Sequence, residues 1–144
     1  MKKFQFSLEP VLEQRSKKEQ EALLSQSRAE QIYRERLQLL QRTQASLESC
    51  MEMAGKSPLG EMHRLMYQEV LKSQMLQQSN QTQMAKHKFD QACQRTTRAR
   101  QDRLIIEKLK EKQLAQYHQQ IRMLEAKVID ELATTMHARK MSKG

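Results

Sequence analysis

Apolar side chains recur along most of this sequence at the spacing of a helix that buries one narrow side. The seam positions from Tyr33 to Ala54 are separated alternately by four and three residues, and the same alternation runs from Leu71 to Ile106. Steps that average 3.5 residues place one stripe of a helix against a neighbouring helix, as in a coiled coil. The pattern therefore predicts two long helices that pack along one seam.

Glycine and proline interrupt this pattern at one internal place, residues 55–60. The stretch contains Gly55, Pro58 and Gly60, whereas residues 61–143 contain neither residue type. A glycine costs about 1 kcal/mol and a proline about 3 kcal/mol in a helix interior, so the helices are expected to separate here. We predict an all-α fold, a long antiparallel two-helix coiled-coil hairpin that forms a single domain over residues 1–144. Helix one is expected at about 8–54, the turn at 55–60 and the longer helix two at about 61–140.

Both helices begin near residues that suit helix N-termini. Ser7 is placed to cap the first helix, with Glu9 in its first turn. Ser57 precedes Pro58, and proline is favoured at the first position of a helix because its missing N–H has no intrahelical partner there. We therefore predict Ser7 and Ser57 as the two N-caps.

The unequal helix lengths leave the end of helix two without an intramolecular partner beyond about residue 108. An apolar stripe nevertheless continues there at helical spacing, through Leu114, Tyr117, Ile121, Leu124, Val128 and Leu132. An apolar stripe that no neighbouring helix covers indicates a surface for another protein. Self-association into a dimer or bundle is the alternative.

The charge of the chain leaves a nucleic-acid role open but does not favour it. The formal net charge is +9, and residues 55–144 hold 17 Lys/Arg against nine acidic residues. Such a surface can attract nucleic acid, anionic lipid or an acidic protein. The basic segment 86–112 contains Phe89 as its one aromatic residue, so it offers no platform for stacking bases. No apolar run is long enough for a transmembrane helix, and we expect no direct membrane insertion.

The residues of enzyme and metal sites are present but scattered. Gly55-Lys56-Ser57 resembles the end of a phosphate-binding loop, yet Cys50 stands where that motif needs its first glycine. The four histidines, at positions 63, 87, 118 and 137, are too far apart to form a chelating pair on one helix turn. Cys50 and Cys93 lie far apart in the predicted hairpin, so no disulfide is expected between them. We predict a protein that is not an enzyme and that needs no cofactor or metal.

Several short motifs follow one another in an order typical of one known family. They are Phe4-x-Phe6-x-Leu8-x-x-Val11-Leu12-x-x-Arg15-x-x-x-Glu19, then Tyr67-Gln68, Leu109-Lys110-Glu111-Lys112, and Leu124-Glu125-x-Lys127-x-x-Asp130-Glu131-Leu132-Ala133. Together they resemble the flagellar type III export protein FliJ family, whose members are coiled-coil stalk proteins associated with an ATPase. The stalk proteins of virulence-type secretion systems are a related alternative.

The resemblance implies a role, partners and a location. It implies a non-catalytic stalk of the flagellar export apparatus that promotes assembly of the ATPase ring and protein export. The implied partners are the hexameric export ATPase (FliI-like), the cytoplasmic domain of the export-gate membrane protein (FlhA-like) and export chaperones, with no specific nucleic acid. The implied location is cytoplasmic, peripheral at the cytoplasmic face of the inner membrane. A structural coiled-coil adaptor and a basic nucleic-acid-binding coiled coil are the alternatives.

The resemblance also implies two contact regions. The ATPase-binding residues are expected at the terminal end: Phe4, Phe6, Leu8, Val11, Leu12, Arg15, Leu114, Tyr117, Ile121, Leu124, Val128 and Leu132. The gate-binding residues are expected nearer the turn: Tyr33, Leu37, Leu40, Tyr67, Gln68, Val70 and Leu71.

Overall fold

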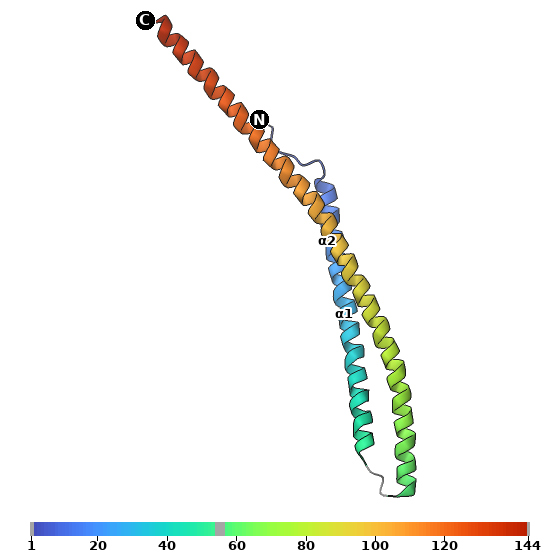
Figure 1. Cartoon of the computed structure of the whole chain (residues 1–144). Coiled ribbons are helices and arrows are strands. Elements are labelled where there is room, and N and C mark those ends of the chain that lie inside the picture. Colours follow the sequence, from blue (N-terminus) through green and yellow to red (C-terminus); the bar gives the residue numbers. More distant parts are fainter. Residues whose placement is uncertain (1, 54–56, 144) are drawn as a thin grey trace. The chain divides into compact units, whose positions relative to one another are not determined.

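The computed structural model describes residues 2–53 and 57–143, and two helices contain nearly all of them (Figure 1). Helix α1 spans Glu9–Glu52 and helix α2 spans Pro58–Ser142. The predicted antiparallel hairpin with a longer second helix is confirmed. The predicted turn was too long at its C-terminal side, because α2 already begins at Pro58. The rest of that turn falls on residues 54–56, which lie outside the described residues.

The chain divides into two compact units, and each helix contributes to both. The hairpin unit comprises Lys17–Arg100 and the terminal unit comprises Met1–Ser16 with Gln101–Gly144. Within the parts of the chain that the structure describes, neither helix is long and apolar enough to cross a membrane.

The seam of the hairpin unit is narrow and built largely from small side chains. Its buried residues are Glu19, Thr43, Cys50, Leu71, Thr82, Ala85, Ala92 and Thr96. Small residues let two helix backbones approach closely, but each removes little apolar surface from water. Leu71, which is 4% exposed, is the large apolar side chain of this set.

The buried threonines need no partner across the seam. The hydroxyl of Thr82 donates to the carbonyl of Gln78 at 2.7 Å, and that of Thr96 donates to Ala92 at 3.0 Å. Thr43 makes the same bond to Leu39 at 3.1 Å. Each bond runs to the preceding turn of the same helix, as threonine hydroxyls often do. These threonines therefore place polar atoms in the seam without the cost of leaving them unpaired, whereas the buried side-chain oxygen of Gln78 has no hydrogen-bond partner among the described residues.

Polar and aromatic contacts cross the seam where apolar residues are few. The rings of Tyr33 and Phe89 stack with centroids 6.2 Å apart. Towards the other end of the hairpin unit, Arg100 Nε lies 3.5 Å from the carboxylate of Glu19, a residue that is itself buried. The sequence has no apolar residue between positions 13 and 21. The seam there includes an ion pair in place of apolar packing.

The turn end is fixed by two capping arrangements. The Ser57 hydroxyl accepts a hydrogen bond from the backbone N–H of Gly60 at 3.1 Å, which confirms Ser57 as the N-cap of α2. The guanidinium of Arg64 donates to the carbonyls of Cys50 (3.4 Å) and Met51 (3.3 Å) in the last turn of α1. Carbonyls at a helix C-terminus have no intrahelical donor, so Arg64 satisfies them from the neighbouring helix.

The predicted N-cap of α1 was placed one residue too early. The carbonyl of Leu8 accepts from the N–H of Leu12 at 2.9 Å, which is the first bond of the helical pattern. A turn precedes it, closed by a bond of 3.1 Å from the N–H of Glu9 to the carbonyl of Phe6. The N-cap position therefore belongs to Leu8 instead of Ser7, because this turn delays the start of the helix.

Candidate functional site

The N-terminal residues 2–8, here called the strap, lie along α2 outside any helix (Figure 1). Phe6 is buried at 8% exposure, and the ring of Phe4 lies 5.4 Å from that of Tyr117. The phenol hydroxyl of Tyr117 donates to the carbonyl of Lys2 at 2.7 Å. Phe4 and Phe6, predicted to contact an ATPase, thus point into the protein's own terminal unit.

Ion pairs join the start of α1 to α2 beside the strap. Lys110 Nζ lies 2.8 Å from a carboxylate oxygen of Glu9 and 6.0 Å from the centre of the Phe6 ring. Arg15, another predicted contact residue, pairs with Asp102 at 3.1 Å. Both pairs are partly exposed, and such pairs contribute little stability, about 0–1 kcal/mol each. They align the first turns of α1 with residues 102–110 of α2.

The predicted stripe on α2 divides into a covered half and a bare half. Leu114, Tyr117 and Ile121 are half-buried in the structure, whereas Leu124, Val128 and Leu132 are 51–58% exposed. The prediction that the stripe loses its intramolecular partner near residue 108 was therefore wrong for the covered half. An extended chain advances about 3.3 Å per residue and a helix 1.5 Å, so a few strap residues pass alongside about twice as many helical ones.

The bare half is wider than the sequence indicated. Every described residue from position 122 to 143 is exposed. Beside the predicted stripe, α2 presents further large apolar side chains that were not predicted as site residues. We define the C-terminal face as Leu124, Val128, Ile129, Leu132 and Met136, which are all exposed. The sequence did contain a signal for this face, because positions 128, 132 and 136 succeed one another by four residues and so lie on one side of a helix. Contiguous exposed apolar surface of this kind marks an interaction site.

The predicted gate-binding residues separate into buried and exposed groups. Leu71 is in the core of the hairpin unit, and Tyr33, Leu37, Leu40 and Gln68 are half-buried. Tyr67 and Val70 are exposed and available to a partner.

A second apolar face accompanies Tyr67 and Val70 near the turn. We define the hairpin-end face as Leu59, Met62, Met66 and Val70, each more than half exposed. These residues follow one another by three or four positions, so they lie on one side of α2. The same spacing was visible in the sequence, but apolar spacing alone does not tell a seam from an outer face.

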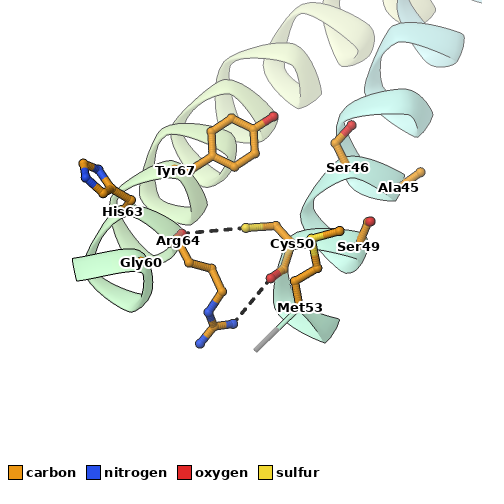
Figure 2. Close-up of a pocket in the computed structure, with 9 residues that line it drawn as sticks. All are labelled: Ala45, Ser46, Ser49, Cys50, Met53, Gly60, His63, Arg64 and Tyr67. Atoms are coloured by element: carbon orange, nitrogen blue, oxygen red, sulfur yellow. Dashed lines mark hydrogen bonds between the residues drawn. The ribbon is translucent and has the colours of Figure 1, made fainter. Parts of the chain in front are cut away.

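A groove of about 750 Å³ opens between the ends of the two helices (Figure 2). It is lined by Ala45, Ser46, Ser49, Cys50, Met53, Gly60, His63, Arg64 and Tyr67. Figure 2 shows a reciprocal contact in which the Cys50 thiol donates to the carbonyl of Arg64 at 3.7 Å while Arg64 donates to the carbonyl of Cys50.

The electrostatics of the groove come mainly from Arg64. The hydrogen bond from Arg64 to the Glu61 carboxylate raises the pKa of the guanidinium above its ordinary value. The ion pair with Glu61 and the hydrogen bonds to the carbonyls of Cys50 and Met51 hold the cation at the end of α1.

The described residues offer binding surfaces more clearly than a site for chemistry. Over residues 2–53 and 57–143, no group of three or more His, Cys, Asp or Glu side chains is placed to hold a metal ion. Cys50 is a buried free thiol whose contact is a backbone carbonyl, and Cys93 is a partly exposed free thiol. Among the exposed apolar side chains, those of the C-terminal face and those of the hairpin-end face each follow one another at helical spacing along one side of α2.

Comparison with protein-family models gives a match over most of the chain. The family model described as "Flagellar FliJ protein" matches residues 4–142. No curated protein and no solved structure matches the chain significantly. The matched region includes residues 4–8 of the strap, both helices and both apolar faces.

Proposed function

The chain belongs to the FliJ family of flagellar export components, and from this premise we propose that it is a non-catalytic stalk that binds the hexameric export ATPase. In this proposal the terminal unit docks on the ATPase and favours assembly of its ring. The hairpin unit contacts the cytoplasmic domain of the export gate. These contacts hold the protein at the cytoplasmic face of the inner membrane, where it also meets export chaperones.

The observation that carries the ATPase proposal is the C-terminal face. Leu124, Val128 and Leu132 stand on a single helix with more than half of each side chain exposed. Burying one such side chain contributes about 1.5–3 kcal/mol. A partner that covers the face therefore gains several residues' worth of apolar burial without first displacing another helix. A stalk that inserts its end into a ring requires a surface of this kind.

The hairpin-end face supports the proposed gate contact. Met62 and Met66 are flexible and polarisable, and methionine-rich surfaces adapt to differently shaped partners. Tyr67 adds an exposed ring beside them. Of the residues implied by the family resemblance, Tyr67 and Val70 are the ones placed to meet a gate protein directly.

The decisive experiment removes two apolar side chains from the C-terminal face. The double variant Leu124→Ser/Val128→Ser is expected to lose well over tenfold in affinity for the purified export ATPase, because two apolar contacts of at least about 1.4 kcal/mol each are lost. Stimulation of ATP hydrolysis by the ring is expected to fall with it. Helix content should be unchanged, since both residues are exposed in the free protein.

The matched control is Leu76→Ser/Met84→Ser, which removes two apolar side chains of the hairpin unit that are somewhat more exposed than Leu124 and Val128. This control should bind and stimulate the ATPase like the unaltered protein. Equal loss in both double variants would mean that apolar surface in general, and not this face, determines binding. Sedimentation of the free protein tests self-association: a dimer that dissociates in Leu124→Ser/Val128→Ser would assign the face to a second copy instead.

A further inference from the structure

The strap and the C-terminal face share one continuous side of α2. Tyr117, Ile121, Leu124 and Val128 follow one another by four, three and four residues, which keeps them on the same helix face. The strap lies over the first part of this side, where Tyr117 contacts Phe4 and Lys2. The second part is bare from Leu124 onward. A partner helix laid along the bare part therefore meets the strap at about residue 121 if it extends towards the turn.

The strap is held to α2 by the burial of the Phe6 ring and by a few weaker contacts. They include the bond from the Tyr117 hydroxyl to the Lys2 carbonyl, the Phe4–Tyr117 ring contact and the position of Lys110 near Phe6. The segment lies outside any helix, so its backbone lacks the ladder of hydrogen bonds that stabilises α1 and α2. Non-helical chain ends with few contacts open at low free-energy cost. The strap is therefore the part of the terminal unit that a competing apolar surface can lift most easily.

We propose that the strap is an intramolecular competitor for the partner that binds the C-terminal face. This inference rests on the proposed function, which identifies that partner as the export ATPase. With the strap in place, the ATPase reaches only the bare half of the stripe. When the strap lifts, Leu114, Tyr117 and Ile121 join the docking surface, and a longer amphipathic helix of the ATPase can lie along it.

The proposed competition predicts the direction in which each variant changes the affinity for the ATPase. A partner that needs the open state binds with an apparent affinity reduced by the fraction of molecules that are open. Loosening the strap therefore strengthens binding, whereas removal of a true contact residue weakens it. If about one molecule in ten is open, a variant that opens the strap fully binds about tenfold more tightly.

The test uses the full chain and the purified flagellar export ATPase. The double variant Phe4→Ala/Phe6→Ala removes the aromatic anchors of the strap. Gln5→Ala alters the exposed residue between them and is the matched control. Tyr117→Phe deletes only the bond to the Lys2 carbonyl and leaves the apolar face intact. We expect about tenfold tighter ATPase binding for the double variant, a smaller gain for Tyr117→Phe and no change for Gln5→Ala.

A second measurement is made on the free protein, without the ATPase. Hydrogen exchange of the strap backbone and the fluorescence of an added apolar dye should both increase in Phe4→Ala/Phe6→Ala, with helix content preserved. A synthetic peptide of residues 2–8 added to this variant should reverse both the dye signal and the gain in ATPase affinity.

The outcomes separate this inference from the docking proposal. Weaker or unchanged ATPase binding by Phe4→Ala/Phe6→Ala and by Tyr117→Phe would overturn the competition, and would place the strap within the docking surface or outside it altogether. If Leu124→Ser/Val128→Ser binds normally while the strap variants bind more tightly, the competition stands for the covered half of the stripe alone, and the C-terminal face is not part of the docking site. Absence of ATPase binding by every variant and by the unaltered protein would overturn both.

Discussion

Leu71 is the side chain on which the hairpin unit depends most, and Leu71→Ala should measure how its thin seam is stabilised. Its side chain is 4% exposed, while its neighbours in the seam are mainly alanine and threonine. Leucine loses about three methylene equivalents on truncation, and each is worth about 0.8 kcal/mol when buried, so the loss is about 2.4 kcal/mol. The cavity penalty seen in globular cores should be small, because a seam between two helices can close or admit water.

The measurement is urea unfolding followed by far-ultraviolet circular dichroism. With a denaturant slope of about 2 kcal/mol per molar urea, a loss of about 2.4 kcal/mol lowers the midpoint by about 1.2 M. The matched control is Leu76→Ala, which truncates the same side chain at a position that is 67% exposed. Its free energy of unfolding should change by less than about 0.5 kcal/mol. Equal midpoints for the two variants would refute the assignment of Leu71 to the core.

Three further predictions concern the Arg64 cap at the turn end and the reactivity of the two thiols. Arg64→Met should speed hydrogen exchange in the last turn of α1, because the carbonyls of Cys50 and Met51 lose their donor. Arg64→Lys should restore part of the protection. Unchanged exchange in Arg64→Met would show that Arg64 does not cap α1. The hydrogen bond to Glu61 raises the pKa of the Arg64 guanidinium. The cap is therefore fully present below the ordinary guanidinium pKa and is lost only as pH rises through the higher pKa of the folded protein. Protection of the last turn of α1 from hydrogen exchange should not vary between neutral and mildly alkaline pH, once intrinsic exchange rates are corrected. A thiol reagent should modify Cys93 faster than Cys50, because Cys50 is buried and its thiol is bonded to a backbone carbonyl. Mass spectrometry of a time course measures the two rates. The opposite order would mean that the groove around Cys50 opens readily.

The fold was predictable because the helix-breaking residues are concentrated in one place. Ser57 and Pro58 marked the start of α2, since both residue types act through local backbone geometry, although the bounds expected for helix two began about three residues later, at about 61. Ser7 failed as a cap because the turn formed by residues 6–9 depends on Phe6 being anchored against α2, a contact distant in sequence. The strap could not be predicted, because an extended segment has no helical periodicity that would reveal what it covers.

The candidate site was predictable only in part, because helical spacing does not reveal which side of a helix another segment covers. Leu124, Val128 and Leu132 were expected to be exposed, since helix one ends before it could reach them. Tyr33 and Leu71 were assigned to a partner contact, although the same apolar spacing also placed them in the seam, where the structure has them packed. Met62 and Met66 form an outer face with the spacing of a seam. Spacing identifies a side of a helix, but only the position of the other helix determines which side is covered.

The bonding of the seam threonines affects how the two helices of the hairpin unit can move against each other. Thr82 and Thr96 hydrogen-bond to their own helix, so an axial displacement of α1 along α2 breaks no hydrogen bond at these positions. Ala85 and Ala92 present low, smooth surfaces that resist such a displacement weakly. Packed helices that slide by small amounts are the elements of shear motion in proteins. The reciprocal contact between Cys50 and Arg64 fixes the register at the turn end. The Arg100–Glu19 ion pair and the hydrogen bond from Arg36 to Gln81 also cross the seam, so an axial displacement would strain these polar contacts before it met resistance from the alanines and threonines.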